Sequence, residues 1–510
     1  MPSTNTRATP DLDTLLSLDG GTQTAIVTGE ERWTRAELDH CVSALAATLS
    51  ADGVDRGDRV ALVSKDPITV LAMMLAALRL GAVTVPINWR SSPQDAARVI
   101  ADADPILALG DEDLATTAQV GAVALPLGRR RFSAWVDGRD PIGASGAQDP
   151  DRPAVLIYTS GTSGDPKGVV LTADNLAHKV IGTQDDWGVR ATSVSLLATP
   201  LFHIGGLSWA LVALAARAPL IVPDPARGRT LRSTIEEHQV THAFLVPKLL
   251  TDLVQDHASR TGPPSPIEMV LCGAAPVSIA LQRQAIDVLG CRLLQVYGLT
   301  ETTGSVTQLD VARAIAGPDP DQALASCGTP FPWVGLDIRD PHDASPLPPG
   351  EHGEIWISSA QNCAGYWRRP TASAELQVNG WLRTGDAGHL DEDGRLHITD
   401  RLKDVIISGG ENIYSVEVER ALQSMPAVRD AAVVGRPDHE WGETVVAVVE
   451  LHDDAALDLT EVADHVGRQI GRFKRPRDLV VVDELPRNAT GKILKAEVRR
   501  MVSTHQKGTA

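Results

Sequence analysis

Apolar runs that resemble strands alternate with helical patterns through the first four hundred residues of this chain. Residues 59–64 (RVALVS) and 82–87 (AVTVPI) predict buried strands, and the apolar stretch 68–81 between them predicts a helix. The same order returns further along, over residues 219–247. Because neighbouring parallel strands need a long crossover, usually a helix, this alternation predicts α/β layers with largely parallel sheets.

The chain is too long for one hydrophobic core. At 510 residues it exceeds the size at which a single core keeps growing, so two or more domains are expected. From Gly353 onward, shorter alternating strands predict a β-rich subregion, and a mixed α and β pattern follows Asp400. We therefore expect an α/β fold with a large N-terminal domain over residues 1–400, a hinge at 401–403 and a small α+β C-terminal domain over 404–510.

Charge and cysteine content argue against several classes of function. The formal net charge of −18, from 47 basic and 65 acidic residues, disfavours general binding to nucleic acid or to an anionic membrane surface. The first residues lack the apolar core of a signal peptide, and no apolar stretch is long enough to span a bilayer. Five widely spaced cysteines without a CxxC pair indicate neither a disulfide framework nor a zinc site. We expect a cytoplasmic protein, and its oligomeric state stays open, a homodimer included.

The run YTSGTSGDPKG, Tyr158 to Gly168, has the composition of a phosphate-binding loop between two strands. Glycine frees backbone N–H groups to point at an anion, the hydroxyl groups add donors, and one lysine adds a full positive charge. The run matches neither GxxxxGKS/T nor GxGxxG, so neither a P-loop NTPase nor a dinucleotide-binding dehydrogenase is indicated. A surface turn rich in serine and glycine is the alternative. The residues expected to hold a nucleotide's phosphates are Thr159, Ser160, Gly161, Thr162, Ser163, Gly164 and Lys167.

Seven motifs in a fixed order carry a resemblance to a known family. They are YTSGTSGDPKG, PLFHIGG (200–206), CGAAP (272–276), YGLTE (297–301), RTGD (383–386), DRLKDVIISGGENIYS (400–415) and PRNATGKILK (486–495). In these motifs the chain resembles the adenylate-forming superfamily, which includes acyl-CoA synthetases, nonribosomal peptide adenylation domains and firefly luciferase. The resemblance covers nearly the whole length. It implies ATP, Mg²⁺ and coenzyme A as cofactors, and a small C-terminal domain that moves between two half-reactions.

The resemblance implies roles for the motifs that follow buried strands. It makes Tyr297 the ring that stacks on adenine, Thr300 a contact to phosphate and carboxylate, and Glu301 a magnesium ligand. Ordinary partial burial is the alternative for Tyr297. Tight packing is the alternative for the small residues of CGAAP. The small residues expected at the nucleotide and acyl pockets are Gly273, Ala274, Ala275 and Gly298.

The motifs RTGD and DRLKD imply a ribose site and a hinge. Asp386 matches the family aspartate that accepts hydrogen bonds from two ribose hydroxyl groups. The alternative is that Asp386 only closes an Asx-turn, which needs no ligand. Arg401 matches the arginine that adds a ribose or phosphate contact, and this role depends on the surrounding motif because a lone arginine is usually solvated. Lys403 occupies the hinge position, where many relatives carry an aspartate.

Three further positions complete the implied machinery. By resemblance, Lys492 enters the active site and bridges the attacking carboxylate and the α-phosphate, with a solvated loop lysine as the alternative. In the second half-reaction Gly409 and Gly410 approach the channel for the pantetheine of coenzyme A. His203 is assigned a positioning role at the acyl pocket rather than proton transfer. The alternative is a purely structural histidine whose hydrogen bonds are satisfied within the fold.

The implied activity is ATP-dependent formation of an acyl-adenylate with release of pyrophosphate, followed by transfer to the thiol of coenzyme A. Segments 361–375 and 380–386, together with the C-terminal domain, favour this acceptor, because they most resemble stand-alone acyl-CoA ligases. Residues 202–216 lack an acidic residue to pair with an ammonium group, so an apolar or aromatic acid is preferred to an α-amino acid. We hypothesise that Trp209 limits the length of the acid that the pocket accepts.

Other outcomes of the same adenylation chemistry stay open. The acyl group could pass to a carrier-protein pantetheine or to an amine, or the adenylate could be oxidised as in luciferase. A regulator that binds nucleotide without catalysis is a further alternative. Such a regulator would be expected to lose Lys167, Glu301 or Lys492, and all three are present.

Overall fold

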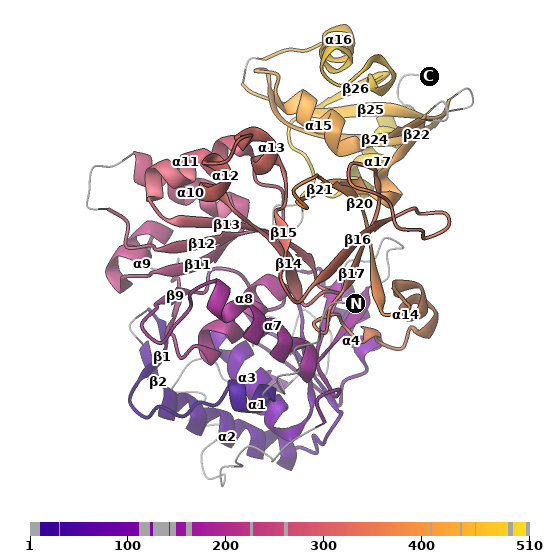
Figure 1. Cartoon of the computed structure of the whole chain (residues 1–510). Coiled ribbons are helices and arrows are strands. Elements are labelled where there is room, and N and C mark those ends of the chain that lie inside the picture. The colour runs from indigo at the N-terminus through magenta and orange to yellow at the C-terminus, as the bar shows by residue number, and fades with distance from the viewer. Residues whose placement is uncertain are drawn as a thin grey trace. The chain divides into compact units, whose positions relative to one another are not determined.

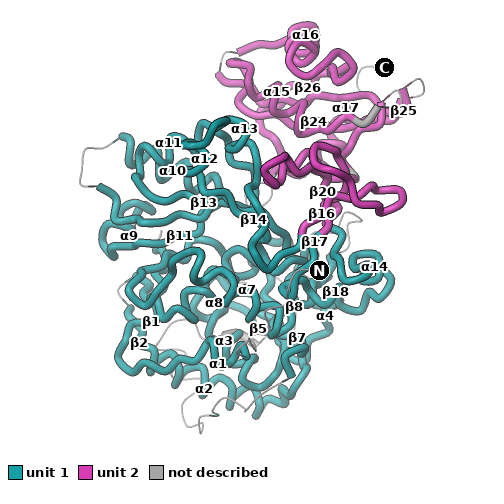
Figure 2. The backbone as a smooth tube through the Cα atoms, in the orientation of Figure 1, with its two compact units in different colours: residues 1–335, 357–383 teal, residues 336–356, 384–510 magenta. Residues whose placement is uncertain are grey.

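The described part of the computed structural model comprises residues 11–29, 31–111, 123–125, 142, 149–159, 166–224, 228–259, 264–408, 411–438, 441–453, 455–487 and 493–505. The chain divides into two compact units (Figure 2): unit 1 is Met1–Gly335 with Ile357–Arg383, and unit 2 is Leu336–Trp356 with Thr384–Ala510. The hinge expected at 401–403 lies inside unit 2 and stays a prediction. The predicted site residues outside the described residues are Ser160, Gly161, Thr162, Ser163, Gly164, Gly409, Gly410 and Lys492.

Two mainly parallel sheets form the framework of unit 1 (Figure 1). The first has the order β15 (Thr329–Pro330), β14 (Gly304–Asp310), β13 (Arg292–Leu299), β12 (Met269–Cys272), β11 (His242–Leu245), β9 (Ser195–Leu196), β10 (Leu220–Val222), β1 (Thr24–Thr28), β2 (Glu31–Thr34). The second has the order β18 (Gly365–Tyr366), β8 (Lys167–Thr172), β7 (Pro153–Thr159), β4 (Val83–Pro86), β3 (Arg59–Val63), β5 (Leu107–Asp111), β6 (Val123–Leu125). The pairs β1–β2, β13–β14, β14–β15, β7–β8 and β8–β18 are antiparallel. The predicted α/β class is confirmed.

Helices α7 and α8 lie side by side in unit 1 (Figure 1). Helix α8 packs on β10, β11 and β14 of the first sheet, while α7 packs on β8 of the second, so this pair connects the two sheets. The described helices of unit 1 are α1 (Leu12–Leu15), α2 (Arg35–Ala51), α3 (Pro67–Leu80), α4 (Pro93–Ala103), α7 (Ala173–Asp186), α8 (Ile204–Ala215), α9 (Leu231–His238), α10 (Pro247–Ala258), α11 (Ile279–Leu289), α12 (Val311–Ile315), α13 (Pro320–Ala325) and α14 (Pro370–Leu376).

The start of α8 explains two glycines of the PLFHIGG motif. A Cβ atom on Gly206 would lie 2.4 Å from the carbonyl oxygens of Thr199 and Pro200, and one on Gly205 would lie 2.7 Å from the ring of Phe244. Contacts this short do not occur, so both positions need glycine for the chain to turn into the helix. Packing at the start of α8 therefore accounts for the two glycines of this motif, in addition to the family resemblance.

A third sheet has the order β16 (Gly335–Arg339), β17 (Gly353–Ser358), β20 (Trp381–Leu390), β19 (Gln377–Val378), and β21 (Leu396–Arg401) pairs with β20. Strand β20 pairs antiparallel with β19 and with β21. The boundaries between the two units fall within β16, β17 and β20. This sheet is the β-rich subregion that the sequence predicted from Gly353 onward.

The rest of unit 2 contains a mixed sheet that is buried on both faces. Its order is β23 (Glu411–Ile413), β22 (Ile406–Ser408), β25 (Gly442–Leu451), β24 (Val428–Asp438), with β26 (Asp478–Val482) parallel to β25. The described helices are η2 (Leu402–Asp404), α15 (Ser415–Gln423), α16 (Leu459–Gln469), η3 (Arg472–Lys474) and α17 (Lys495–His505). Val433 and Val445 belong to the core with α15 and α16, whereas Val434 and Val446 belong to the core with α17. Successive strand residues point to opposite faces, which explains the unbroken apolar runs of β24 and β25.

Among the described residues, no helix combines the length and the apolar character that a bilayer crossing requires. The five cysteines, all within the described ranges, are free thiols.

Candidate active site

A β-hairpin holds the two ends of the predicted phosphate loop. Strand β7 ends at Thr159 and β8 begins at Lys167, and these two residues pair across the antiparallel register. A Cβ atom on Gly168 would lie 2.9 Å from the ring of Tyr158, so the hairpin needs glycine there. Residues 160–165 between the strands are outside the described part. The hairpin therefore fixes Lys167 where the predicted loop returns to the sheet.

Tyr366 connects Lys167 to the predicted magnesium ligand. Its hydroxyl group donates a hydrogen bond of 2.8 Å to Glu301 Oε1. The Nζ atom of Lys167 lies 5.1 Å from the centroid of the Tyr366 ring, within the range of a cation–π contact. Sequence reasoning did not single out Tyr366, although it lies in the segment 361–375 that was noted for its family likeness. An aromatic residue after a glycine in that segment was the available signal.

The surroundings of Glu301 fit a magnesium ion whose remaining ligands come from water and substrate phosphates. The side chain is partly exposed, and only its Oε1 atom accepts a hydrogen bond within the described chain. No group of three or more His, Cys, Asp or Glu residues that could hold a metal occurs among the described residues. Mg²⁺ is usually held by one or two carboxylates, water and substrate phosphates. One available carboxylate, linked through Tyr366 to Lys167 at the end of the predicted phosphate loop, is consistent with that coordination.

The turn that carries Thr300 and Glu301 is tightly built. Thr302 Oγ1 donates a 2.7 Å hydrogen bond to the carbonyl group of Gly304. Thr303 has a φ angle of 51°, which is rare for a β-branched residue. A Cβ atom on Gly298 would lie 2.0 Å from the carbonyl oxygen of Gly304, which excludes any larger residue. These contacts fix the conformation of the turn, and they show that Gly298 has a packing role.

The CGAAP turn contains one packing residue and one cavity residue. A Cβ atom on Gly273 would lie 2.8 Å from both Cγ2 and the carbonyl oxygen of Val296, so tight packing accounts for this glycine. Ala274 has a φ angle of 69°, in the left-handed region that residues other than glycine rarely adopt, and it lines a cavity. Ala275 follows it and is partly exposed, as is Tyr297 near the end of the neighbouring strand β13.

Asp386 and Arg401 are brought together in unit 2. They pair across β20 and β21, and Arg401 Nε lies 2.7 Å from Asp386 Oδ1. Asp386 is only 4% exposed, and its backbone N–H group donates to Thr384 Oγ1 at 3.1 Å. Such a buried and charge-assisted pair holds the carboxylate in one orientation. Lys403 follows on the 3₁₀ helix η2, where only its backbone is described.

His203 lies at the first position before α8 and does not cap that helix with its side chain. Burial, together with the charge of Arg90, lowers the pKa of His203 to about 4. Its Nε2 atom is buried and has no hydrogen-bond partner among the described residues. The imidazole is therefore neutral near pH 7, which agrees with a positioning role better than with proton transfer.

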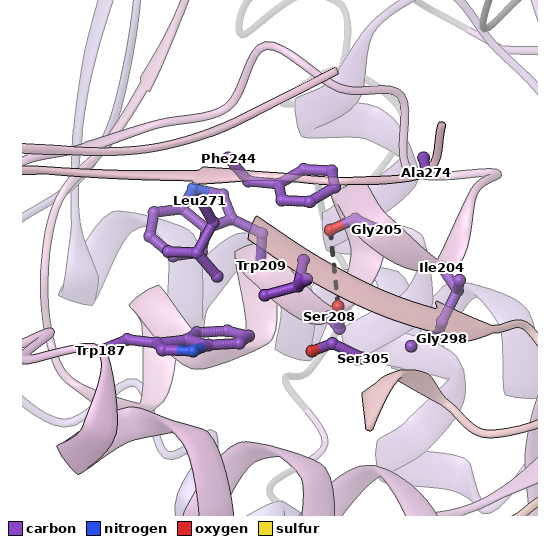
Figure 3. Close-up of a pocket in the computed structure, with 12 residues that line it drawn as sticks. Trp187, Ile204, Gly205, Ser208, Trp209, Phe244, Leu271, Ala274, Gly298 and Ser305 are labelled. Carbon is purple, nitrogen blue, oxygen red and sulfur yellow. Dashed lines mark hydrogen bonds between the residues drawn. The ribbon is translucent and has the colours of Figure 1, made fainter. Parts of the chain in front are cut away.

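A cavity of about 60 Å³, measured as the space open to the centre of a water-sized sphere, lies between α8 and the first sheet (Figure 3). Trp187, Trp209 and Phe244 supply its aromatic walls, and Ser208 and Ser305 supply its hydroxyl groups. None of its described lining residues is acidic. The turn that carries Glu301 begins and ends beside Gly298 and Gly304, which both line this cavity. The turn with the predicted magnesium ligand therefore adjoins an apolar pocket.

Comparison with known proteins agrees with the motifs and with this arrangement. Residues 19–367 match the AMP-binding enzyme family, and residues 417–492 match the AMP-binding enzyme C-terminal domain. The chain belongs to the AMP-binding enzyme family, as its motifs predicted.

Similar proteins align along most of the chain. The chain is 35% identical over 487 residues to a feruloyl-CoA synthase from Amycolatopsis sp, which covers 94% of this chain and 95% of that protein. It is 33% identical over 468 residues to a fatty acid–[acyl-carrier-protein] ligase from Streptomyces coeruleorubidus, which covers 89% of each. The solved structure of o-succinylbenzoate coenzyme A synthetase from Bacillus subtilis with ATP and magnesium ion superposes with a TM-score of 0.83 and 28% identity, over 96% of this chain and 98% of that one.

Proposed function

We propose that this chain activates a carboxylic acid with ATP, releases pyrophosphate, and transfers the acyl group to the thiol of coenzyme A. The observation that carries the proposal is the placement of Lys167 and Glu301 around Tyr366, at the turn that adjoins the apolar cavity. The similar feruloyl-CoA synthase and o-succinylbenzoate coenzyme A synthetase support an AMP-forming acid–thiol ligase.

The first half-reaction joins two anions, so the protein must neutralise and align them. A carboxylate oxygen attacks the α-phosphorus of ATP, and the bond to the pyrophosphate group breaks. Lys167 supplies positive charge at the phosphate loop, and Lys492 is proposed to bridge the carboxylate and the α-phosphate. Glu301 would hold Mg²⁺, which screens the charge of the phosphate oxygens when it is bound. Tyr297 is proposed to stack on adenine and Thr300 to contact the reacting groups.

The second half-reaction needs a different arrangement of the C-terminal part. The thiol sulfur attacks the acyl carbon, the bond to AMP breaks, and the thiol proton passes to solvent. We propose that rotation about Lys403 withdraws Lys492 and brings Gly409 and Gly410 toward the pantetheine channel. Asp386 and Arg401, already paired, would keep hold of the ribose through both steps.

The cavity favours an apolar or aromatic acid. Its three aromatic side chains offer flat apolar surface, and its described lining has no carboxylate to pair with an α-ammonium group. The names of the similar proteins also include acids that contain a ring, in feruloyl-CoA and o-succinylbenzoate. Trp209 is held by a 2.9 Å hydrogen bond from its Nε1 to the carbonyl oxygen of Leu196, so its ring is a fixed wall of the pocket.

The proposal is tested by measuring pyrophosphate release from ATP over a panel of acids, followed by thioester formation with coenzyme A. We expect release with aryl acids in the presence of Mg²⁺. The Lys492→Ala variant should lose adenylate formation and largely keep thioester formation from supplied acyl-AMP, and Lys248→Met on an exposed surface is the matched control. Absence of pyrophosphate release with every acid would contradict the proposed activity.

A carrier-protein thiol is the second candidate acceptor. The similarity to a fatty acid–[acyl-carrier-protein] ligase favours testing it. Free coenzyme A and a phosphopantetheinyl carrier protein can be offered at equal thiol concentration after the preferred acid is known. Thioester formation only on the carrier protein would replace coenzyme A as the proposed acceptor.

We also propose a cytoplasmic location. The five free thiols include four that are buried, and burial raises the pKa of Cys272 and Cys363 to about 12. Unpaired thiols are typical of proteins in reducing compartments. Rapid disulfide formation in the cellular protein, measured by thiol trapping, would argue against this location.

A further inference from the structure

Lys179 is a buried lysine behind the aromatic cavity. It lies on α7, is 1% exposed, and its Nζ atom donates to the carbonyl oxygen of Ser305 at 2.8 Å and to Ser305 Oγ at 2.6 Å. The same atom lies 4.9 Å from the ring centroid of Trp187 and 5.1 Å from that of Phe331. Across the described ranges, no carboxylate lies within ion-pairing distance of it. A buried amine without a counter-ion is costly to a fold, so its retention calls for a reason.

The contact with Lys179 leaves the hydroxyl group of Ser305 able to donate. A serine hydroxyl group has one proton to donate and two lone pairs to accept with, and Lys179 occupies one lone pair. No group in the described part of the chain accepts a hydrogen bond from Ser305 Oγ. Ser305 lines the cavity. Its proton is therefore available to a molecule in the cavity, and a donor amine behind the oxygen makes the hydroxyl group a stronger donor.

A second hydroxyl group, that of Ser208, belongs to the lining of the same cavity (Figure 3). Ser208 also lines the cavity, and its one hydrogen bond within the described chain, to the carbonyl oxygen of Gly205, is long at 3.4 Å. A Cβ atom on Gly304 would lie 3.5 Å from Ser208 Oγ and 3.7 Å from Lys179 Cε, which places both side chains around that glycine. One part of a mainly aromatic cavity is therefore polar.

We propose that the acid bound here carries, in addition to its reacting carboxylate, an oxygen atom on its aromatic body that accepts a hydrogen bond from Ser305. Ser305 is the contact residue, with Ser208 beside it, and Lys179 is a positioning residue that orients and polarises the Ser305 hydroxyl group. This inference rests on the proposed function and makes its substrate class narrower. Burial, which lowers the pKa of Lys179 well below its usual value, agrees with an amine that serves as an internal donor.

The test compares matched acids on the full-length protein. The probes are 3-phenylpropanoic acid and its ring-substituted 4-hydroxy, 4-acetyl and 4-carboxy analogues, with pyrophosphate release measured as kcat/KM. We expect the unaltered protein to prefer at least one oxygen-bearing acid by about tenfold, the upper end of what one neutral hydrogen bond contributes. The three analogues distinguish a phenol, a ketone and a carboxylate as the source of the oxygen.

Two variants separate recognition from structural support. Ser305→Ala and Lys179→Met should remove the preference by lowering kcat/KM for the oxygen-bearing acid about tenfold and leaving the plain acid within about threefold. Lys179→Gln keeps a neutral donor and should restore part of the preference. Lys248→Met, on the exposed surface of α10, is the matched lysine control.

Each outcome has a defined meaning. An equal loss for all acids in both variants would show that Lys179 and Ser305 only support the fold, and the inference would be overturned. If Lys179→Met does not fold, Ser305→Ala decides alone, and an unchanged preference in that variant overturns the inference. Activity with plain acids and no preference for oxygen also overturns it, while the proposed function stands. Failure to release pyrophosphate with any acid removes the proposed function itself.

Discussion

Two lysines of unit 1 lie against aromatic rings in opposite environments. Lys167 lies over Tyr366 at the start of β8 and is partly exposed. Lys179 lies near Trp187 and Phe331 inside the molecule and is 1% exposed. Lys167 has no ion-pair partner within the described part of the chain, whereas Lys179 donates both described hydrogen bonds to Ser305. The same residue type is thus open to solvent at one position and makes internal hydrogen bonds at the other.

The difference follows from the free energy of solvation. A lysine in contact with water keeps its charge at little cost and can exchange water for phosphate oxygens. A lysine removed from water is favoured as the neutral amine, because burial disfavours the charged form. We therefore expect substitution of Lys167 to affect ATP chemistry with every acid. Substitution of Lys179 should affect only those acids that use the polar part of the cavity.

The largest effect is expected from Lys167→Met. Removing one preorganised positive group from a charge-transfer site costs roughly 10²- to 10³-fold in rate, so pyrophosphate release should fall by that amount. The loss should be equal for plain and oxygen-bearing acids, measured as kcat/KM at saturating Mg²⁺. A loss confined to one class of acid would contradict the assignment of Lys167 to the phosphate groups.

The exchange of lysine for arginine, which is larger and always charged, tests how much room and solvent each environment offers. Lys179→Arg inserts a larger group into a packed interior and should destabilise the protein by about 1–3 kcal/mol. Lys167→Arg keeps a positive charge at a partly exposed site and should leave the unfolding midpoint almost unchanged. Urea unfolding followed by circular dichroism compares the two variants. Equal destabilisation would mean that Lys167 is more confined than its partial exposure indicates.

The strands that carry the candidate site residues could be predicted from short motifs in the sequence. The glycines and the lysine of YTSGTSGDPKG indicated a phosphate loop, and the strands around it form as expected. Asp386 and Arg401 were predicted separately, and the antiparallel register brings them together. In each case local residue types and strand pattern determine the placement.

Contacts between distant segments could not be predicted in the same way. Tyr366 meets Glu301 across 65 positions of sequence, and Lys179 meets Ser305 across 126. Each pair depends on how strands and helices pack, and neither Tyr366 nor Lys179 stands in a pattern that indicates a chemical role. Lys179 also appears in an ordinary amphipathic helix sequence, so its burial is visible only when α8 and β14 are in place.

A pH dependence is expected from Lys179. Its pKa in the folded protein lies well below the usual 10.5, so between these values the unfolded chain binds a proton that the folded chain does not. The free energy of unfolding should therefore rise with pH in that window, by up to about 1.4 kcal/mol per pH unit. Lys179→Met removes this slope. The measurement is the difference in unfolding free energy between the unaltered protein and Lys179→Met from pH 7 to pH 9, and a difference independent of pH would show that Lys179 stays protonated in the fold.

The smallest effect is expected from Tyr366→Phe, which separates the ring under Lys167 from the hydroxyl group on Glu301. The ring remains, so the cation–π contact is kept, while the 2.8 Å hydrogen bond to Glu301 Oε1 is lost. A single hydrogen bond contributes about 0.5–1.5 kcal/mol, so pyrophosphate release should fall about two- to tenfold. Because Glu301 is the proposed magnesium ligand, the loss should appear as a higher Mg²⁺ requirement and be relieved at high Mg²⁺. A loss as large as that of Lys167→Met and insensitive to Mg²⁺ would instead mean that the tyrosine hydroxyl group acts on the reacting phosphate directly.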